Sequence, residues 1–134
     1  MARSLAATIE AANSAIMVEG RLDAIATFFA PDYFVHLTNQ EMTGGHELVR
    51  KVCQQYRRAF EVHGVDVEIL VKSKDRMAWQ RTIRATHKGA FKGFPATGSS
   101  IVWRDMVTTR FCDGLIAEEW LLSDLAEQLL KARK

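Results

Sequence analysis

Ionisable side chains interrupt the apolar face of three consecutive strand-like runs, residues 76–87, 101–111 and 115–124. Successive side chains of a strand point to opposite faces, so every second residue shares a surface. The face that is mostly aromatic and aliphatic also carries Arg81, His87, Asp105, Glu118 and Asp124. Burying isolated charges costs several kcal/mol unless they are paired or hydrated. The pattern therefore predicts a cavity lined by apolar and ionisable side chains together.

Asp124 is the residue that we expect to carry a proton. It follows Trp120 and Leu122 on the predicted inward face and lies near the end of the last run. Aromatic surroundings disfavour the charged form of a carboxyl group, which raises its pKa toward the range useful for acid/base catalysis. A structural alternative stays open, because Asp is a favoured N-cap and a terminal helix follows.

Arg81 and Asp105 lie on neighbouring runs and predict an ion pair. The pair could be purely structural. It could also hold the guanidinium so that Arg81 polarises a substrate oxygen while Asp124 moves a proton. We predict that both members of the pair line the site. Glu118, nearer the hairpin, is expected to form a structural pair with a strand arginine.

Further candidates are histidines and tryptophans. His36 stands in the short apolar run 33–37 and could orient or protonate a substrate, although a backbone carbonyl often satisfies a lone histidine of this kind. His87 ends the run 76–87, where it is either structural or a rim residue at the cavity mouth. Three large aromatic residues are expected to bind substrate as the cavity wall: Trp79, Trp103 and Trp120.

Three stretches have the apolar spacing of helices, each followed by residues that end helices. They are 5–16 before Gly20, 22–29 before Pro31, and 48–60 before His63 and Gly64. A terminal helix follows Asp124, with Leu125, Leu129 and Leu130 as its apolar residues.

Strand signals fill most of the remaining chain. Alternation predicts strands over 33–37 and 65–71 besides the three long runs, 39–45 has loop composition, and Asp113-Gly114 predicts a two-residue hairpin. Helices followed by a meander of long antiparallel strands indicate an α+β fold with helices on one face of a curved sheet. The void between helices and sheet is a natural ligand site.

Length and composition set the remaining expectations. The 134 residues, with a formal charge of +2, predict one domain over residues 1–134 and argue against a nucleic-acid partner. Cys53 and Cys112 lack metal-ligand spacing and a CxxC motif, which predicts free thiols in a reducing compartment. No apolar segment approaches the roughly 20 residues of a membrane span, and no secretory signal is evident, so a cytoplasmic location away from membranes is expected. Zinc, P-loop and nucleophile-elbow motifs are absent from the sequence.

Three motifs follow one another along the chain: Phe29–His36, Thr86–Gly98 and Phe111–Trp120, the last followed by Asp124. Their composition and order resemble those of the SnoaL-like polyketide cyclases, a branch of the NTF2-like superfamily. The resemblance implies a cone-shaped fold, frequent homo-oligomers, no metal and no organic cofactor. It also implies ring closure by aldol condensation with a pocket carboxylate as acid/base. Asp124 matches the position of that carboxylate, and His36 matches a histidine of the first strand.

Arg81 departs from the family pattern, because many relatives have a tryptophan there and this chain has its tryptophan at position 79. A cation in the wall suits an anionic or enolate-bearing ligand. The leading hypothesis is a small enzyme without a cofactor that cyclises, isomerises or dehydrates a small apolar oxygenated molecule. Two alternatives stay open. One is a hydrolase similar to limonene epoxide hydrolase that uses the set Asp105, Arg81 and Asp124. The other is a non-catalytic ligand-binding or dimerisation module, because the polar outer face of the sheet would suit a symmetric dimer interface. A homodimer or higher homo-oligomer is expected.

Overall fold

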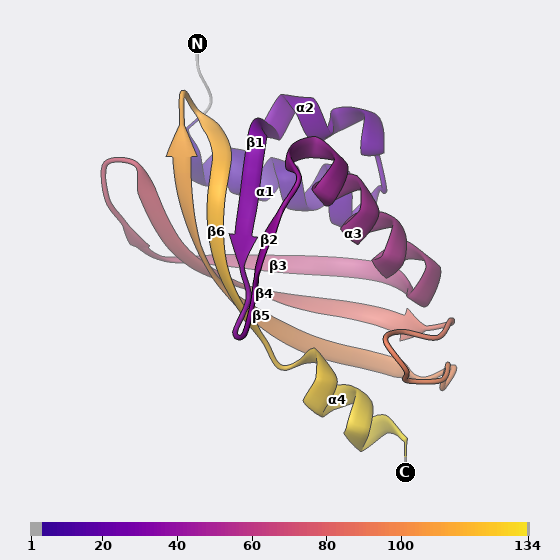
Figure 1. Ribbon diagram of the computed structural model, residues 1–134. Coiled ribbons are helices and arrows are strands. Elements are labelled where there is room, and N and C mark those ends of the chain that lie inside the picture. Colours follow the sequence, from indigo (N-terminus) through magenta and orange to yellow (C-terminus); the bar gives the residue numbers. More distant parts are fainter. Residues whose placement is uncertain (1–3, 134) are drawn as a thin grey trace.

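The computed structural model describes residues 4–133 and contains one six-stranded sheet with helices packed against it (Figure 1). The strand order is β2-β1-β6-β5-β4-β3, and every pairing is antiparallel except that of β1 with β6. The helical segments are α1 (Leu5–Ala12), the π-helix η1 (Asn13–Val18), the 3-10 turn η2 (Leu22–Ala24), α2 (Ile25–Phe28), α3 (Gly45–Ala59) and α4 (Leu125–Ala132). The strands are β1 (Phe29–His36), β2 (Glu41–Thr43), β3 (Phe60–Lys72), β4 (Arg76–His87), β5 (Ser100–Cys112) and β6 (Leu115–Ser123). Among the described residues, no helix has the length and apolar character needed to cross a membrane.

The sheet bends around α1, α2 and α3, which lie together on its inner face (Figure 1). One apolar cluster joins these helices to the inner face, with Ile9, Val49 and Trp79 among its members. A second cluster contains Phe60 and Trp103 together with Leu125 and Leu129 of α4. This arrangement confirms the predicted α+β fold with helices on one face of a curved, mostly antiparallel sheet.

The first helix changes its character at Asn13. The sequence predicts a continuous helix through Ile16, but α1 ends at Ala12 and the wider π-helix η1 takes over. The side-chain amide of Asn13 donates a hydrogen bond to the carbonyl oxygen of Ile9 at 2.9 Å. π-Helical turns of this kind often accompany functional sites, and Asn13 is one of the residues that meet in the candidate site.

Pro31 lies inside β1 and does not end the second helix as the sequence predicts. Proline has no backbone N–H to donate to a neighbouring strand. The pairing of β1 with β6 is irregular between Phe29 and Phe34, so Pro31 lies where no regular backbone hydrogen bond to β6 is required. Residues 41–43, which lie in a predicted loop, form the short edge strand β2.

The prediction that His63 and Gly64 end the third helix is wrong, because α3 ends at Ala59 and both residues lie within β3. The pairing with β4 is shifted by one residue between Val62 and Gly64, which makes His63 the extra residue of a β-bulge. A Cβ atom at Gly64 would lie 2.3 Å from the guanidinium of Arg84. Glycine therefore leaves room here for the side chain of Arg84 to lie across the strand.

A second bulge, at the start of β6, decides which acids reach the inner face. Phe111 pairs with Ile116, but Arg110 pairs with Glu118, so Ala117 is the extra residue. Ile116 and Ala117 are both buried in succession. The predicted alternation is therefore wrong beyond this point, because Glu118 takes the outer face and the next residue turns inward.

Candidate active site

A cavity of about 170 Å³ lies between the helices and the inner face of the sheet. Most of its wall is apolar, with side chains from α1, η1, α3, β1, β4 and β6. The polar side chains that line it are Asn13, Tyr33, Cys53, Gln55, Tyr56, Arg81, Lys92 and Glu119. Within residues 4–133, no three His, Cys, Asp or Glu side chains are grouped so that they could hold a metal ion.

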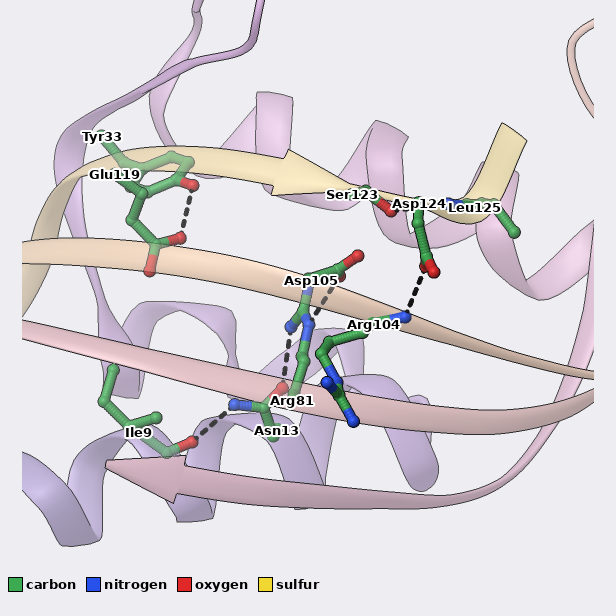
Figure 2. A network of polar contacts seen from close by, with 10 residues as sticks. All are labelled: Ile9, Asn13, Tyr33, Arg81, Arg104, Asp105, Glu119, Ser123, Asp124 and Leu125. Atoms are coloured by element: carbon green, nitrogen blue, oxygen red, sulfur yellow. Dashed lines mark hydrogen bonds and ion pairs between the residues drawn. The ribbon is translucent and has the colours of Figure 1, made fainter. Parts of the chain in front are cut away.

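Arg81 is fixed in the wall by two partners. Its Nε donates to Oδ2 of Asp105 at 2.8 Å, and its Nη1 donates to Oδ1 of Asn13 at 2.8 Å (Figure 2). Arg81 and Asp105 are direct cross-strand neighbours, so the predicted ion pair is present. No hydrogen bond within the described part of the chain engages Nη2 of Arg81. Because Arg81 also lines the cavity, this end of the guanidinium is left to meet a ligand.

The Arg81 side chain is 16% exposed and the Asp105 side chain 3%, so the pair is largely withdrawn from water. Burial by itself lowers the pKa of Arg81, but the charge and hydrogen bond of Asp105 offset this and leave the pKa above its ordinary value. The guanidinium is therefore a permanent positive charge beside the cavity. Asp105 holds it there without lining the cavity itself.

Glu119 is the carboxyl group that reaches the cavity. It accepts hydrogen bonds from the hydroxyl of Tyr33 at 2.8 Å and from the hydroxyl of Thr109 at 2.5 Å. The indole N–H of Trp79 donates to the same Thr109 hydroxyl at 2.9 Å. These contacts fix Glu119 in a buried network, and Figure 2 shows it beside Tyr33.

Burial is the largest influence on Glu119 and raises its pKa, and the negative charge of Asp105 adds to this effect. The hydrogen bonds from Thr109 and Tyr33 and the charge of Arg81 act in the opposite direction, but the pKa stays above its ordinary value. Glu119 therefore keeps its proton to a higher pH than an exposed glutamate. A buried carboxyl group with a raised pKa at a cavity is a candidate for acid/base chemistry.

Glu119 and Tyr33 are functional residues that the sequence pattern does not predict. For Glu119 the reason is that one strict alternation through residues 115–124 places Glu118 on the inner face instead. The bulge at Ala117 reverses the faces of the following residues. The succession Leu115-Ile116-Ala117, apolar without alternation, is the local signal that could have indicated the bulge. In β1, the face of Tyr33 and Val35 lines the cavity and the opposite face carries His36.

His36 and Trp120 lie on the outer face of the sheet, away from the cavity-lining residues. The His36 ring stacks on Trp120 with centroids 5.0 Å apart, and its Nε2 lies 2.6 Å from Oε2 of Glu118. Glu118 also accepts from Nε of Arg110 at 2.7 Å, which is the expected structural pair with a strand arginine. The inward positions predicted for His36, Glu118 and Trp120 are therefore wrong.

Asp124 stands at the N-cap position of α4 and is absent from the cavity lining. Its Oδ1 accepts from the backbone N–H of Arg104 at 2.7 Å (Figure 2). Its Oδ2 accepts from the side-chain amide of Gln128 at 3.1 Å. The one-residue shift in β6 places Ser123, and not Asp124, opposite Asp105. The geometry therefore brings Arg81 and Asp105 together but leaves Asp124 apart from them.

Among the other predicted wall residues, only Trp79 lines the cavity. Trp103 and His87 are buried around Phe60 of the second apolar cluster. The ring centroid of Phe60 lies 4.9 Å from that of Trp103 and 5.1 Å from that of His87. His87 is fully buried, so its predicted position at the rim is wrong and the structural alternative describes it better. Trp103 supports the wall of the cavity from behind, because it stacks on the lining residue Tyr56 with ring centroids 6.3 Å apart.

Comparison with known proteins shows which family this chain belongs to. The family model for "SnoaL-like polyketide cyclase" matches residues 7–131. No curated protein sequence matches the chain. The crystal structure of IdmH, "a putative polyketide cyclase" from Streptomyces antibioticus, is similar at 26% identity and a TM-score of 0.80, over 98% of this chain and 99% of that one. AclR, "a putative hydroxylase" from Streptomyces galilaeus, is similar at 25% identity and a TM-score of 0.78, over 97% of this chain and 83% of that one.

A polyketide cyclase candidate from Acidithiobacillus ferrooxidans shares the fold at 21% identity and a TM-score of 0.81, over 97% of this chain and 95% of that one. The NTF2-like fold implied by the sequence motifs is thereby confirmed. The match of the family model covers nearly the whole chain. The chain belongs to the SnoaL-like polyketide cyclase family.

Proposed function

We propose that the protein catalyses proton transfer next to a carbonyl group of a small, largely apolar, oxygenated molecule, in a cyclisation, isomerisation or dehydration. The observation that carries this proposal is a pair of side chains at one cavity. Glu119 is a buried carboxyl group with a raised pKa, and Arg81 is a fixed guanidinium with an unengaged end. We assign the role of proton carrier to Glu119.

In the proposed step, the carboxylate of Glu119 takes a proton from the carbon next to the carbonyl. The electron pair of that C–H bond moves toward the carbonyl oxygen, and Arg81 stabilises the negative charge that develops there. In a cyclisation, the resulting enolate attacks a second carbonyl of the substrate, and the alkoxide so formed takes the proton back from Glu119. In an isomerisation, the enolate takes the proton back at another carbon. In a dehydration, the enolate expels a hydroxyl group from the next carbon, and Glu119 protonates this group so that it leaves as water. A positioned acid/base contributes about 10²–10⁴-fold to such a rate.

Asp105 and Asn13 act as positioning residues in this scheme, because they hold the guanidinium at 2.8 Å each. Tyr33 and Thr109 hold the Glu119 carboxyl in the same way. Asp124 matches the family position of the catalytic carboxylate, so it is the competing candidate for proton carrier. Its engagement with the Arg104 backbone outside the cavity lining favours Glu119.

A small neutral ketone tests the proposal without knowledge of the natural substrate. Acetophenone dissolved in deuterium oxide exchanges its methyl protons slowly, and proton NMR follows the exchange. We expect the protein to accelerate this exchange, and we expect Arg81→Met to remove most of the acceleration while the chain stays folded. Exchange at the uncatalysed rate with every small ketone tried would favour the binding module.

The hydrolase alternative uses the same cavity differently. Its predicted set requires Asp124 beside Arg81, but the second partner of Arg81 is Asn13. Incorporation of heavy oxygen from labelled water into the product of a small epoxide would support the hydrolase, and exchange without such incorporation would support the proposed proton transfer.

We also propose that the protein forms a homodimer through the outer face of its sheet. Large apolar side chains are exposed on β3, β5 and β6, where an uncovered patch would be unusual: Leu70, Val71, Val102, Met106 and Leu122. Sedimentation of the protein and of Met106→Lys tests this assembly, and a monomer at micromolar concentration in both would contradict it.

A further inference from the structure

We propose that the natural substrate is a small keto acid whose carboxylate is held by Lys92 at the entrance of the cavity and whose apolar body is about the size of one six-membered ring. This inference rests on the proposed function for the reacting end of the molecule, which faces Arg81 and Glu119. The size, the charge and the position of Lys92 each support it from a separate observation.

The size comes from the cavity itself. Its volume is about 170 Å³, whereas pockets for drug-sized ligands range from about 300 to 1,000 Å³. An engineered apolar cavity of about 150 Å³ binds benzene. One ring with a short substituent therefore fills the present cavity, and a fused multi-ring body does not fit without repacking of the wall.

The charge comes from counting the ionisable groups of the site. Arg81 and Lys92 are the cations of the lining, and Glu119 is its acid. Asp105 neutralises Arg81 from behind at 2.8 Å. Glu119 is engaged by the hydroxyls of Tyr33 and Thr109 and forms no ion pair with Lys92 within residues 4–133, so the group left without a counter-charge is Lys92. No carboxylate among residues 4–133 forms an ion pair with Lys92, so a ligand carboxylate can supply its partner.

The position of Lys92 follows from the connection between β4 and β5. Phe91 and Phe94 exchange backbone hydrogen bonds at 2.8 and 2.9 Å, which makes a tight turn with Lys92 near its tip. Phe91 is buried and packs on Tyr56 of α3 with ring centroids 5.2 Å apart. Lys92 lines the cavity and is itself exposed to solvent, so it stands where the cavity meets water.

Gln55 and Tyr56 line the cavity from the neighbouring part of α3 and carry further hydrogen-bond donors. The entrance therefore presents an ammonium from Lys92 and an amide from Gln55, whereas the hydroxyl of Tyr56 interacts with Arg81 and Asp105 and the acid of the lining, Glu119, is buried in its own hydrogen-bond network. A molecule with its carboxylate at this entrance extends its apolar body past Val52 and Cys53. Its carbonyl then lies on the side of Arg81.

Binding of three unreactive probes tests the inference separately from catalysis. The probes are phenylacetate, its neutral methyl ester, and the three-ring acid anthracene-9-acetate, measured by calorimetry at low ionic strength. The variants are Lys92→Gln and the matched control Lys88→Gln, an exposed lysine of the same connection that does not line the cavity.

We expect the protein to bind phenylacetate roughly two- to fivefold more tightly than the ester, which is the range for a partly exposed ion pair. Lys92→Gln should abolish this preference and Lys88→Gln should keep it. The three-ring acid should bind about tenfold more weakly than phenylacetate, because overfilling a packed site is costly.

Equal affinity for acid and ester, a preference that survives in Lys92→Gln, or tighter binding of the three-ring acid would each overturn the inference. Lack of phenylacetate binding at millimolar concentration would also count against it. Because these probes do not react, their result is independent of the ketone exchange that tests the proposed function. The keto acid can therefore fail while the proton transfer stands, and the reverse also holds.

Discussion

The ion pair between Arg81 and Asp105 gives the prediction whose magnitude follows most directly from the structure. Asp105→Asn keeps the size of the side chain and one oxygen that can accept from Nε of Arg81, but it removes the negative charge. The guanidinium then stays buried beside the cavity with Asn13 as its other partner. The change therefore isolates the electrostatic part of the contact.

Removing one partner of a buried pair costs about 3–5 kcal/mol, because the other charge is left uncompensated. Both side chains are well below one-third exposed, so solvent screening reduces this value little. The amide keeps one oxygen as a hydrogen-bond acceptor, and Asn13 still binds the guanidinium, so we expect Asp105→Asn to cost somewhat less than this range, about 2–3 kcal/mol. The double variant Arg81→Met with Asp105→Leu leaves no unpaired charge and should lose less than the sum of its single changes.

Urea unfolding of Asp105→Asn measures the cost of removing the charge, and urea unfolding of the unaltered protein, Arg81→Met, Asp105→Leu and the double variant measures the coupling. With a slope of about 1–3 kcal/mol per molar urea, the midpoint of Asp105→Asn should fall by roughly 1–2 M. The coupling free energy between the two positions should be about 2–3 kcal/mol. Additive single changes, or a loss for Asp105→Asn below about 0.5 kcal/mol, would refute the view that Asp105 holds a desolvated guanidinium.

Three further predictions concern the acid, the thiols and the outer face. For Glu119, the quantity to follow is the free energy of unfolding of the unaltered protein minus that of Glu119→Gln. This difference should fall as the pH rises above 4.5, because the unfolded chain releases the Glu119 proton there while the folded chain, with its raised pKa, still holds it. A difference that grows with pH would contradict the burial of Glu119. Burial raises the pKa of Cys53 to about 11. At pH 8 a disulfide reagent should therefore modify the exposed Cys112 at least roughly 100-fold faster than the buried Cys53. Equal rates would show that the cavity wall opens. His36→Asn should change the affinity for phenylacetate less than about twofold, since the ring lies on the outer face with Glu118, and a larger loss measured by calorimetry would place His36 at the ligand.

The sequence predicts the fold well, because long alternating runs and helical stripes determine which faces are buried. The inward face of β4 and β5, with Trp79, Arg81 and Asp105, is found where the alternation places it. The predictions that fail lie at irregular points, such as the π-helical turn at Asn13 and the bulge at His63. Such features depend on pairing with distant segments, which local periodicity does not contain.

The candidate site is predictable only in part for the same physical reason. The pair of Arg81 and Asp105 follows from two regular strands, whereas Glu119 depends on one extra residue in β6. A shift of one position exchanges the roles of Glu118 and Glu119, and it moves Asp124 out of line with Asp105. The contact of Tyr33 with Glu119 joins positions 86 residues apart, and the sequence offers no local pattern for it.

The most direct test of the central claim compares two carboxyl groups in the ketone exchange, with Glu119→Gln and Asp124→Asn assayed beside the unaltered protein. If Glu119 moves the proton, Glu119→Gln should slow the exchange by about 10²–10⁴-fold, and Asp124→Asn should change it by less than roughly threefold. Loss of exchange in Asp124→Asn with full activity in Glu119→Gln would contradict the account and return the chemistry to the end of β6.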